Sequence, residues 1–150
     1  MAIAALGVSG FSARPLSAQG GNKYSTRLAP APPLGIRGTP PSAAVAGIGS
    51  ATATLNGKKL TVNGTFEKMA SAATKAQLCL GLATGARLDP IYDLTLTKAP
   101  AASPAGTSGT IAGTFDLNPA QLDGLKKGKL YIQINSEGAP NGHLLGWLLK

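Results

Sequence analysis

Residues 129–150, "KLYIQINSEGAPNGHLLGWLLK", consist of two apolar runs separated by a polar, glycine-rich segment. In the first run, Leu130, Ile132 and Ile134 alternate with polar or aromatic side chains. This period of two is typical of a β-strand that buries one of its faces. The second run carries Trp147. The stretch therefore predicts two strands that are joined by a turn.

The same period recurs upstream of this stretch. Residues 51–55 and 58–66 flank the pair Asn56-Gly57, which favours a two-residue type I′ turn with positive φ at both positions. Further strands are predicted over 75–82, 91–97 and 110–117. The side chains expected to face the core from these strands are Leu60, Val62, Phe66, Ala76, Leu78, Leu80, Leu82, Tyr92, Leu94 and Leu96.

The stretch "NPAQLDGLKKG" predicts the single helix, one or two turns long. Asn118 is a good N-cap, Pro119 suits the first helical position, and Gly128 would end the helix. Leu122 and Leu125 would then be its core-facing pair.

The composition favours short strands and turns. The chain has 150 residues, 20 of them Gly and 11 Pro, and only 13% are charged, which leaves little sequence for long charged helices. We therefore predict an all-β fold: an antiparallel Greek-key-like β-sandwich of about seven strands with one short helix. This domain is expected over residues 46–150, after an extended arm over residues 1–45.

The arm is apolar, proline-rich and basic. The formal net charge of the chain is +8, and residues 1–50 contain four bases and no acid: Arg14, Lys23, Arg27 and Arg37. The arm is interpreted as a signal peptide with a cleavage site near Ala18, as an organelle transit peptide, or as an assembly arm that lies on a partner subunit. A plain linker and a solubilising charge are the simpler alternatives. Its candidate contact residues are Ile3, Leu6, Val8, Phe11, Leu16 and Tyr24.

Chemically reactive side chains are few and scattered. One cysteine, Cys79, excludes an intramolecular disulfide and a zinc site made of cysteines, and His143 is the single histidine. The six carboxylates are not paired, and no nucleophile–base pair, phosphate-binding loop or dinucleotide fingerprint is present. We therefore expect no enzyme activity, no metal and no cofactor. The arm lacks aromatic residues interleaved with bases, so nucleic acid is not expected as a partner either.

The order of the pieces carries a resemblance. The strand "AQLCLG", the strand "GTFDL", the short helix and then "GKLYIQINSEGAPNGHLLGWL" resemble the CHRD domain, over roughly residues 46–149. The matching positions in the last stretch are Gly128, Leu130, Tyr131, Ile132, Ile134, Pro140, Gly142, Leu144, Gly146 and Leu148. The resemblance implies a domain of extracytoplasmic proteins and leaves the arm unmatched.

Departures from the family pattern concern its polar positions. The family commonly has histidine where Asn135 stands, glutamate at His143, arginine at Leu145 and glutamine at Trp147. Its frequent "A-H-I-H-x-G" would place two more histidines at Gln77 and Cys79. The resemblance thus implies a degenerate polar site made of Gln77, Cys79, Asn135 and His143, whose amides and single thiol would hold a transition metal poorly.

The leading hypothesis is a non-catalytic structural or protein-binding module in a larger extracytoplasmic assembly. It would be held by the arm and by an exposed strand surface at Leu145 and Trp147, because tryptophan is a common interface anchor. A strand buried on both faces is the simpler interpretation of that pair. The alternative function is a small-molecule or metal-binding domain that uses the degenerate site. Organelle targeting is the alternative location, and a membrane surface is a further partner open to the N-terminal segment.

Overall fold

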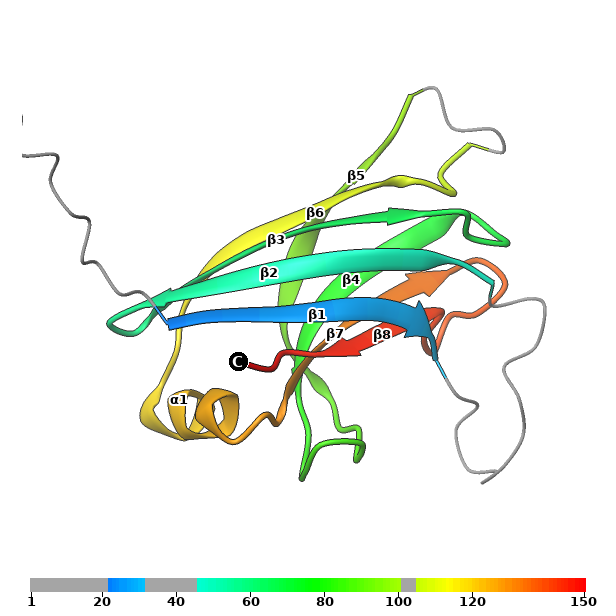
Figure 1. Cartoon of the computed structure of the whole chain (residues 1–150). Helices are drawn as coiled ribbons and strands as arrows, with labels where there is room; N and C mark the ends of the chain where they lie inside the picture. The colour runs from blue at the N-terminus through cyan, green and yellow to red at the C-terminus, as the bar shows by residue number, and fades with distance from the viewer. Residues whose placement is uncertain (1–21, 32–45, 101–104) are drawn as a thin grey trace, which may run out of the picture.

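The computed structural model describes residues 22–31, 46–100 and 105–150 (Figure 1). Within them the chain forms eight antiparallel strands and one short helix. The elements are β1 Asn22–Pro30, β2 Ile48–Asn56, β3 Lys59–Glu67, β4 Ala73–Leu80, β5 Pro90–Lys98, β6 Gly109–Asp116, α1 Pro119–Lys126, β7 Leu130–Ser136 and β8 Leu144–Trp147. The predicted all-β class and the single helix are confirmed.

The strands close into one barrel, in the order β1-β2-β3-β6-β5-β4-β7-β8. The predicted sandwich is therefore wrong in its architecture. A sandwich has two sheets with free edges, whereas here β1 pairs with β2 on one side and with β8 on the other. Ala29 lies opposite Leu145, and an isolated bridge joins Ser25 to Leu149 in the same antiparallel register. This seam removes the last free edge of the sheet.

β1 belongs to the segment that the sequence assigned to the arm. Along this strand Tyr24 and Leu28 are buried, while Lys23, Ser25 and Arg27 are exposed. Residues 22–30 are thus a barrel strand, and the barrel begins well before the expected boundary at residue 46. Tyr24 is 3% exposed, so the prediction that its ring contacts a partner is wrong. The other arm candidates, Ile3, Leu6, Val8, Phe11 and Leu16, lie outside the described residues.

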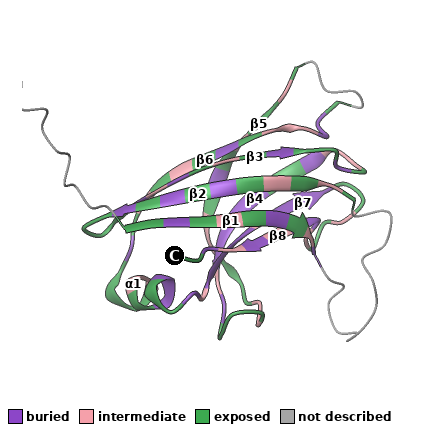
Figure 2. Cartoon of the chain, in the orientation of Figure 1, coloured by how far each residue is buried: buried purple, intermediate pink, exposed green. Residues whose placement is uncertain are grey.

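The core follows from the alternation along each strand (Figure 2). Leu60, Val62 and Phe66 are buried on one face of β3, as predicted. Leu82 is 67% exposed, against prediction, because β4 ends at Leu80 and the chain then turns away from the barrel. Buried side chains from all eight strands and from α1 form one continuous core.

The hairpin between β2 and β3 differs from the predicted turn by one residue. Asn56 is paired with Lys59, so the two loop residues are Gly57 and Lys58. Gly57 has φ +64, and Lys58 is not in the positive-φ region. Glycine at the first loop position alone is typical of a type II′ turn, the other hairpin turn whose twist suits the flanking strands.

The helix closes one end of the barrel. Asn118 caps α1, its side chain accepting from the backbone N of Gln121 at 2.8 Å while the Gln121 side chain accepts from the backbone N of Asn118 at 3.0 Å. Leu125 is buried in the core and Leu122 packs against it, as predicted. Among the described residues, no helix has the length and apolarity needed to cross a bilayer.

One outer face of the barrel is covered with small hydroxyl side chains. The residues of this threonine face alternate with core residues on β2, β3, β6 and β5. They are Ser50, Thr52, Thr54, Thr61, Asn63, Thr65, Thr95, Thr97, Thr110, Ala112 and Thr114. A shallow depression of about 440 Å³ lies over its centre. Charged side chains on this side of the barrel, such as Lys59, Glu67 and Asp116, stand at the ends of the strands rather than over the depression.

Candidate functional site

The outer face of β5, β4, β7 and β8 lies on the other side of the barrel. It carries most of the side chains that the sequence analysis assigned to the degenerate polar site. Strand register places Gln77 opposite Asp93 and opposite Gln133, and Gln133 opposite Leu145. One pair further along, Asn135 lies opposite Lys75. Side chains at directly opposed positions of a sheet share one face and touch, so residues distant in sequence meet here.

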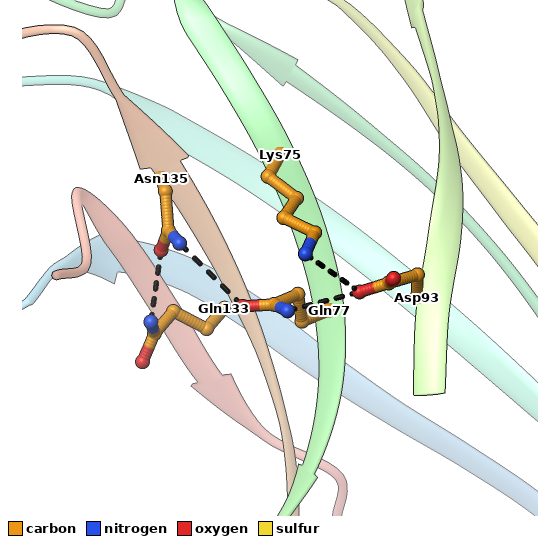
Figure 3. A network of polar contacts seen from close by, with 5 residues as sticks. All are labelled: Lys75, Gln77, Asp93, Gln133 and Asn135. Carbon is orange, nitrogen blue, oxygen red and sulfur yellow. Dashed lines mark hydrogen bonds and ion pairs between the residues drawn. The ribbon is translucent and has the colours of Figure 1, made fainter. Parts of the chain in front are cut away.

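Five of these residues form one hydrogen-bonded chain, the amide network (Figure 3). Gln133 Nε2 donates to Asn135 Oδ1 at 2.8 Å, and Asn135 Nδ2 reaches Gln77 Oε1 at 3.5 Å. Gln77 Nε2 donates to Asp93 Oδ1 at 2.9 Å, and Lys75 Nζ lies 3.3 Å from the same oxygen. The amide network thus runs across three neighbouring strands.

The carboxylate sets the direction of the network. An ionised carboxylate can only accept, so Gln77 must turn its NH₂ to Asp93 and its oxygen to Asn135. Asn135 then offers its own oxygen to Gln133. The Gln77 amide and the Lys75 ammonium hold the pKa of Asp93 below its usual value. Because Gln77 and Asn135 are buried while Asp93 is exposed, the network is fixed at its centre and open to partners at its end.

An aromatic row lies beside the amide network on the same outer face. Cys79 pairs with Tyr131, and Tyr131 pairs with Trp147, whose ring centroid is 4.6 Å away. Burial raises the pKa of the Cys79 thiol to about 11, so it is protonated at neutral pH. Burial also raises the pKa of Tyr131. Trp147 and Leu145 remain half-buried, which leaves apolar surface next to the polar side chains.

A loop over residues 81–89 folds back over this row. The Tyr131 hydroxyl donates to Leu88 O at 2.6 Å and accepts from Leu88 N at 3.2 Å. Arg87 extends further across the face and reaches Gly142. A Cβ placed on Gly142 would lie 3.1 Å from Arg87 Nη1 and 3.3 Å from Gln133 Cδ, so the guanidinium and the Gln133 amide both border this glycine. Gly142 thus leaves room for a guanidinium beside the amide network.

His143 belongs to a different, buried cluster. Its Nε2 lies 2.7 Å from Ala46 O and its Nδ1 2.6 Å from Ser136 Oγ. A carbonyl oxygen only accepts, so Nε2 carries the proton and Nδ1 accepts from the Ser136 hydroxyl. Ser136 Oγ in turn accepts from Ser71 Oγ at 2.8 Å and from Ala139 N at 3.1 Å. Both ring nitrogens are therefore engaged, and the predicted membership of His143 in a degenerate ligand site is wrong.

The sequence profile of the CHRD domain matches residues 31–148. The chain belongs to the CHRD domain family. No curated protein and no solved structure gives a significant match. The CHRD match begins just after β1, although β1 supplies the strand that closes the barrel.

The structure brings together four of the residues that the CHRD resemblance and the strand pattern singled out. Gln77 and Asn135 are bonded to each other, and Leu145 and Trp147 stand on the same outer face. Cys79 shares this face but is 1% exposed. The sequence analysis missed Lys75, Asp93, Gln133, Tyr131 and Arg87. The period of two places the first four of these on the outer face of their strands, away from the core. This alternation was the sequence signal from which they could have been found.

The chemistry open to this CHRD face is hydrogen bonding and apolar contact. Within residues 22–31, 46–100 and 105–150, no three His, Cys, Asp or Glu side chains gather as a metal site would need. Lys75, Gln77, Tyr92 and Asp93 border a shallow groove of about 260 Å³. The face offers amide and carboxylate groups in fixed positions next to half-buried leucine and tryptophan.

Proposed function

We propose that this CHRD domain is a non-catalytic, extracytoplasmic protein-binding module whose contact surface is the outer face of β5, β4, β7 and β8. Membership of the CHRD family supports a structural or protein-binding role, because CHRD domains typically serve as extracellular modules of this kind. The site supports the choice of surface. A partner would be another protein subunit of the assembly in which the domain works.

The observation that carries the proposal is the amide network beside Leu145 and Trp147. Protein interfaces combine apolar anchors, often Trp and Tyr, with a polar surround that supplies hydrogen bonds. Here Trp147 rests on the Tyr131 ring, and the amides of Gln77 and Asn135 are already held by bonds to each other. A surface whose side chains are fixed before binding loses less conformational entropy when a partner arrives.

The closed barrel favours contact through side chains over strand addition. Adding a partner strand to a sheet requires an unpaired edge, and every strand of the described barrel has neighbours on both sides. Contact at this face is therefore made by side chains, rather than by backbone pairing.

The proposal contains no catalytic step. Cys79, the one thiol, is buried and has a raised pKa, so it is a poor nucleophile at neutral pH. His143 has both ring nitrogens engaged within the fold. Neither side chain is placed to activate the other or a bound substrate.

The experiment is an affinity capture from the extracytoplasmic fraction of the native cells, with three forms of the full chain as bait. These are the wild type, Leu145→Glu on the proposed face, and Thr52→Glu on the threonine face as a matched control. We expect one protein to be retained by the wild type and by Thr52→Glu and to be lost with Leu145→Glu. Light scattering of the purified complex then gives its stoichiometry.

Two results would refute the proposal. One is a partner that is lost equally with both glutamate variants, which would mean general surface damage. The other is a wild-type bait that retains nothing specific and remains monomeric at all accessible concentrations. Circular dichroism of each variant checks that the barrel is intact.

A further inference from the structure

Charge is distributed unevenly between the two ends of the barrel. One end, the basic end, is formed by the start of β1, the β2–β3 turn, the β4–β5 loop, the segment with α1 and the residues after β8 (Figure 1). It holds seven lysines against three carboxylates: Lys23, Lys58, Lys59, Lys126, Lys127, Lys129 and Lys150, with Asp89, Asp116 and Asp123. The described residues at the opposite end are closer to balance, with Arg27, Lys68 and Lys98 against Glu67 and Glu137.

Exposed leucines gather at the same basic end. Leu82 is 67% exposed, Leu88 47% and Leu149 49%. Ile48, at the opposite end, is the one other large exposed hydrophobic residue among those described. Large apolar side chains that are left in water beside a charged rim mark an interaction site.

Hydrogen bonds hold these leucines in place. Tyr131 binds the backbone of Leu88 through its hydroxyl, and Thr84 Oγ1 donates to Gly128 O at 2.8 Å. A Cβ placed on Gly128 would lie 2.9 Å from Leu149 Cδ2 and 3.4 Å from Thr84 Oγ1. The β4–β5 loop, the segment after α1 and the C-terminal residues therefore meet at one place.

We propose that the basic end docks onto a membrane surface with anionic lipid headgroups. The leucines would enter the boundary between headgroups and acyl chains, while the lysines remain at the level of the phosphates. Lysine suits this position because its aliphatic stem lies along apolar surface while its ammonium reaches the polar layer.

The placement of the leucines favours a lipid surface over an acidic protein. Leu82 and Leu88 lie on either side of the turn in the β4–β5 loop and Leu149 follows β8, so the exposed apolar side chains come from two separate segments. A fluid lipid layer accepts such side chains without a complementary pocket.

The test uses the full chain in co-sedimentation with vesicles of phosphatidylcholine alone or with about 30% phosphatidylglycerol. The wild type should partition onto the anionic vesicles. In the double variant Lys126→Gln/Lys129→Gln, each lysine removed should lower the partition coefficient about fivefold. The double variant Leu82→Ser/Leu88→Ser should lower partitioning about tenfold. Matched controls at the opposite end, Ile48→Ser and Lys68→Gln/Lys98→Gln, should bind as wild type does.

Three results would overturn the proposal. The first is equal partitioning onto neutral and anionic vesicles, and the second is an equal loss in the opposite-end controls. The third is binding to an acidic polypeptide such as polyglutamate with no binding to either vesicle, which would assign the basic end to a protein partner. None of these variants replaces a side chain of the amide network, Leu145 or Trp147, and partner capture with the lysine variant judges the proposed function of that face separately.

Discussion

Raising the pH above about 9 should destabilise the protein through the thiol of Cys79. The folded state holds this pKa at about 11, against 9.0 for a solvated thiol, because burial disfavours the thiolate. Unfolding hydrates the thiol, and it then ionises near pH 9. Between these two pH values the unfolded state binds fewer protons than the folded state, so the free energy of unfolding falls as the pH rises. Below pH 9 the contribution of this group is constant.

The size of the effect follows from the two pKa values. At about pH 10.5 the difference lowers the free energy of unfolding by about 2 kcal/mol relative to about pH 8. Urea unfolding at both pH values measures it, with fluorescence as the readout. Trp147 is the single tryptophan and packs on Tyr131, so its emission should report the loss of the outer face directly.

Cys79→Ala supplies the control, because alanine cannot titrate. This variant loses some packing at every pH, but its decline between about pH 8 and about pH 10.5 should be smaller than that of the wild type by about 2 kcal/mol. Tyr131, whose pKa is raised mainly by burial, is present in both proteins, but Cys79 adds to that rise, so the difference between the two declines measures the Cys79–Tyr131 pair. Equal declines in the two proteins would show that the thiol is already hydrated, and the account of a buried, unreactive Cys79 would be wrong.

Four further substitutions test the seam, the helix cap and the buried cluster. Gly146→Ala should cost about 3 kcal/mol in urea unfolding, because the added methyl would overlap Thr26 Oγ1 and come within 2.6 Å of the carbonyl oxygen of residue 27; wild-type stability would refute the tight seam. Asn118→Ala should lower the free energy of unfolding by about 1 kcal/mol, because α1 loses its N-cap. Asn118→Asp should retain most of the stabilisation that the cap provides, because aspartate also accepts from the first turn. Ser136→Ala should cost about 2 kcal/mol, because His143 Nδ1 would lose its donor in the interior; an unchanged midpoint would exclude this assignment.

The strands and the helix were largely predictable, because their signals are local. The alternation of Leu60, Val62 and Phe66, and the Asn118 cap of α1, require only a few neighbouring residues. β1 carries the same signal in Tyr24 and Leu28, but Pro30 and the acid-free composition around it favoured an extended arm. Closure of the barrel has no local signal at all, since it depends on pairing between residues about 120 positions apart.

The site was predictable only in part, for a similar reason. Gln77 and Asn135 could be placed together through the CHRD pattern, and the period of two put Leu145 and Trp147 on one face. The direction of the amide network depends on Asp93, which lies on another strand. The burial of His143 depends on Ala46 and Ser136, and the sequence between them gives no indication that these three residues meet.

The seam between β1 and β8 also has a consequence for how the protein is made. β8 and the residues that follow it are synthesised after every other strand of the described barrel, yet they are needed to cover one side of β1. Until they emerge, a nascent chain presents open edges on β1 and β7, and the barrel cannot form around its core. Closure of the barrel therefore waits for β8, whatever order the other strands pair in.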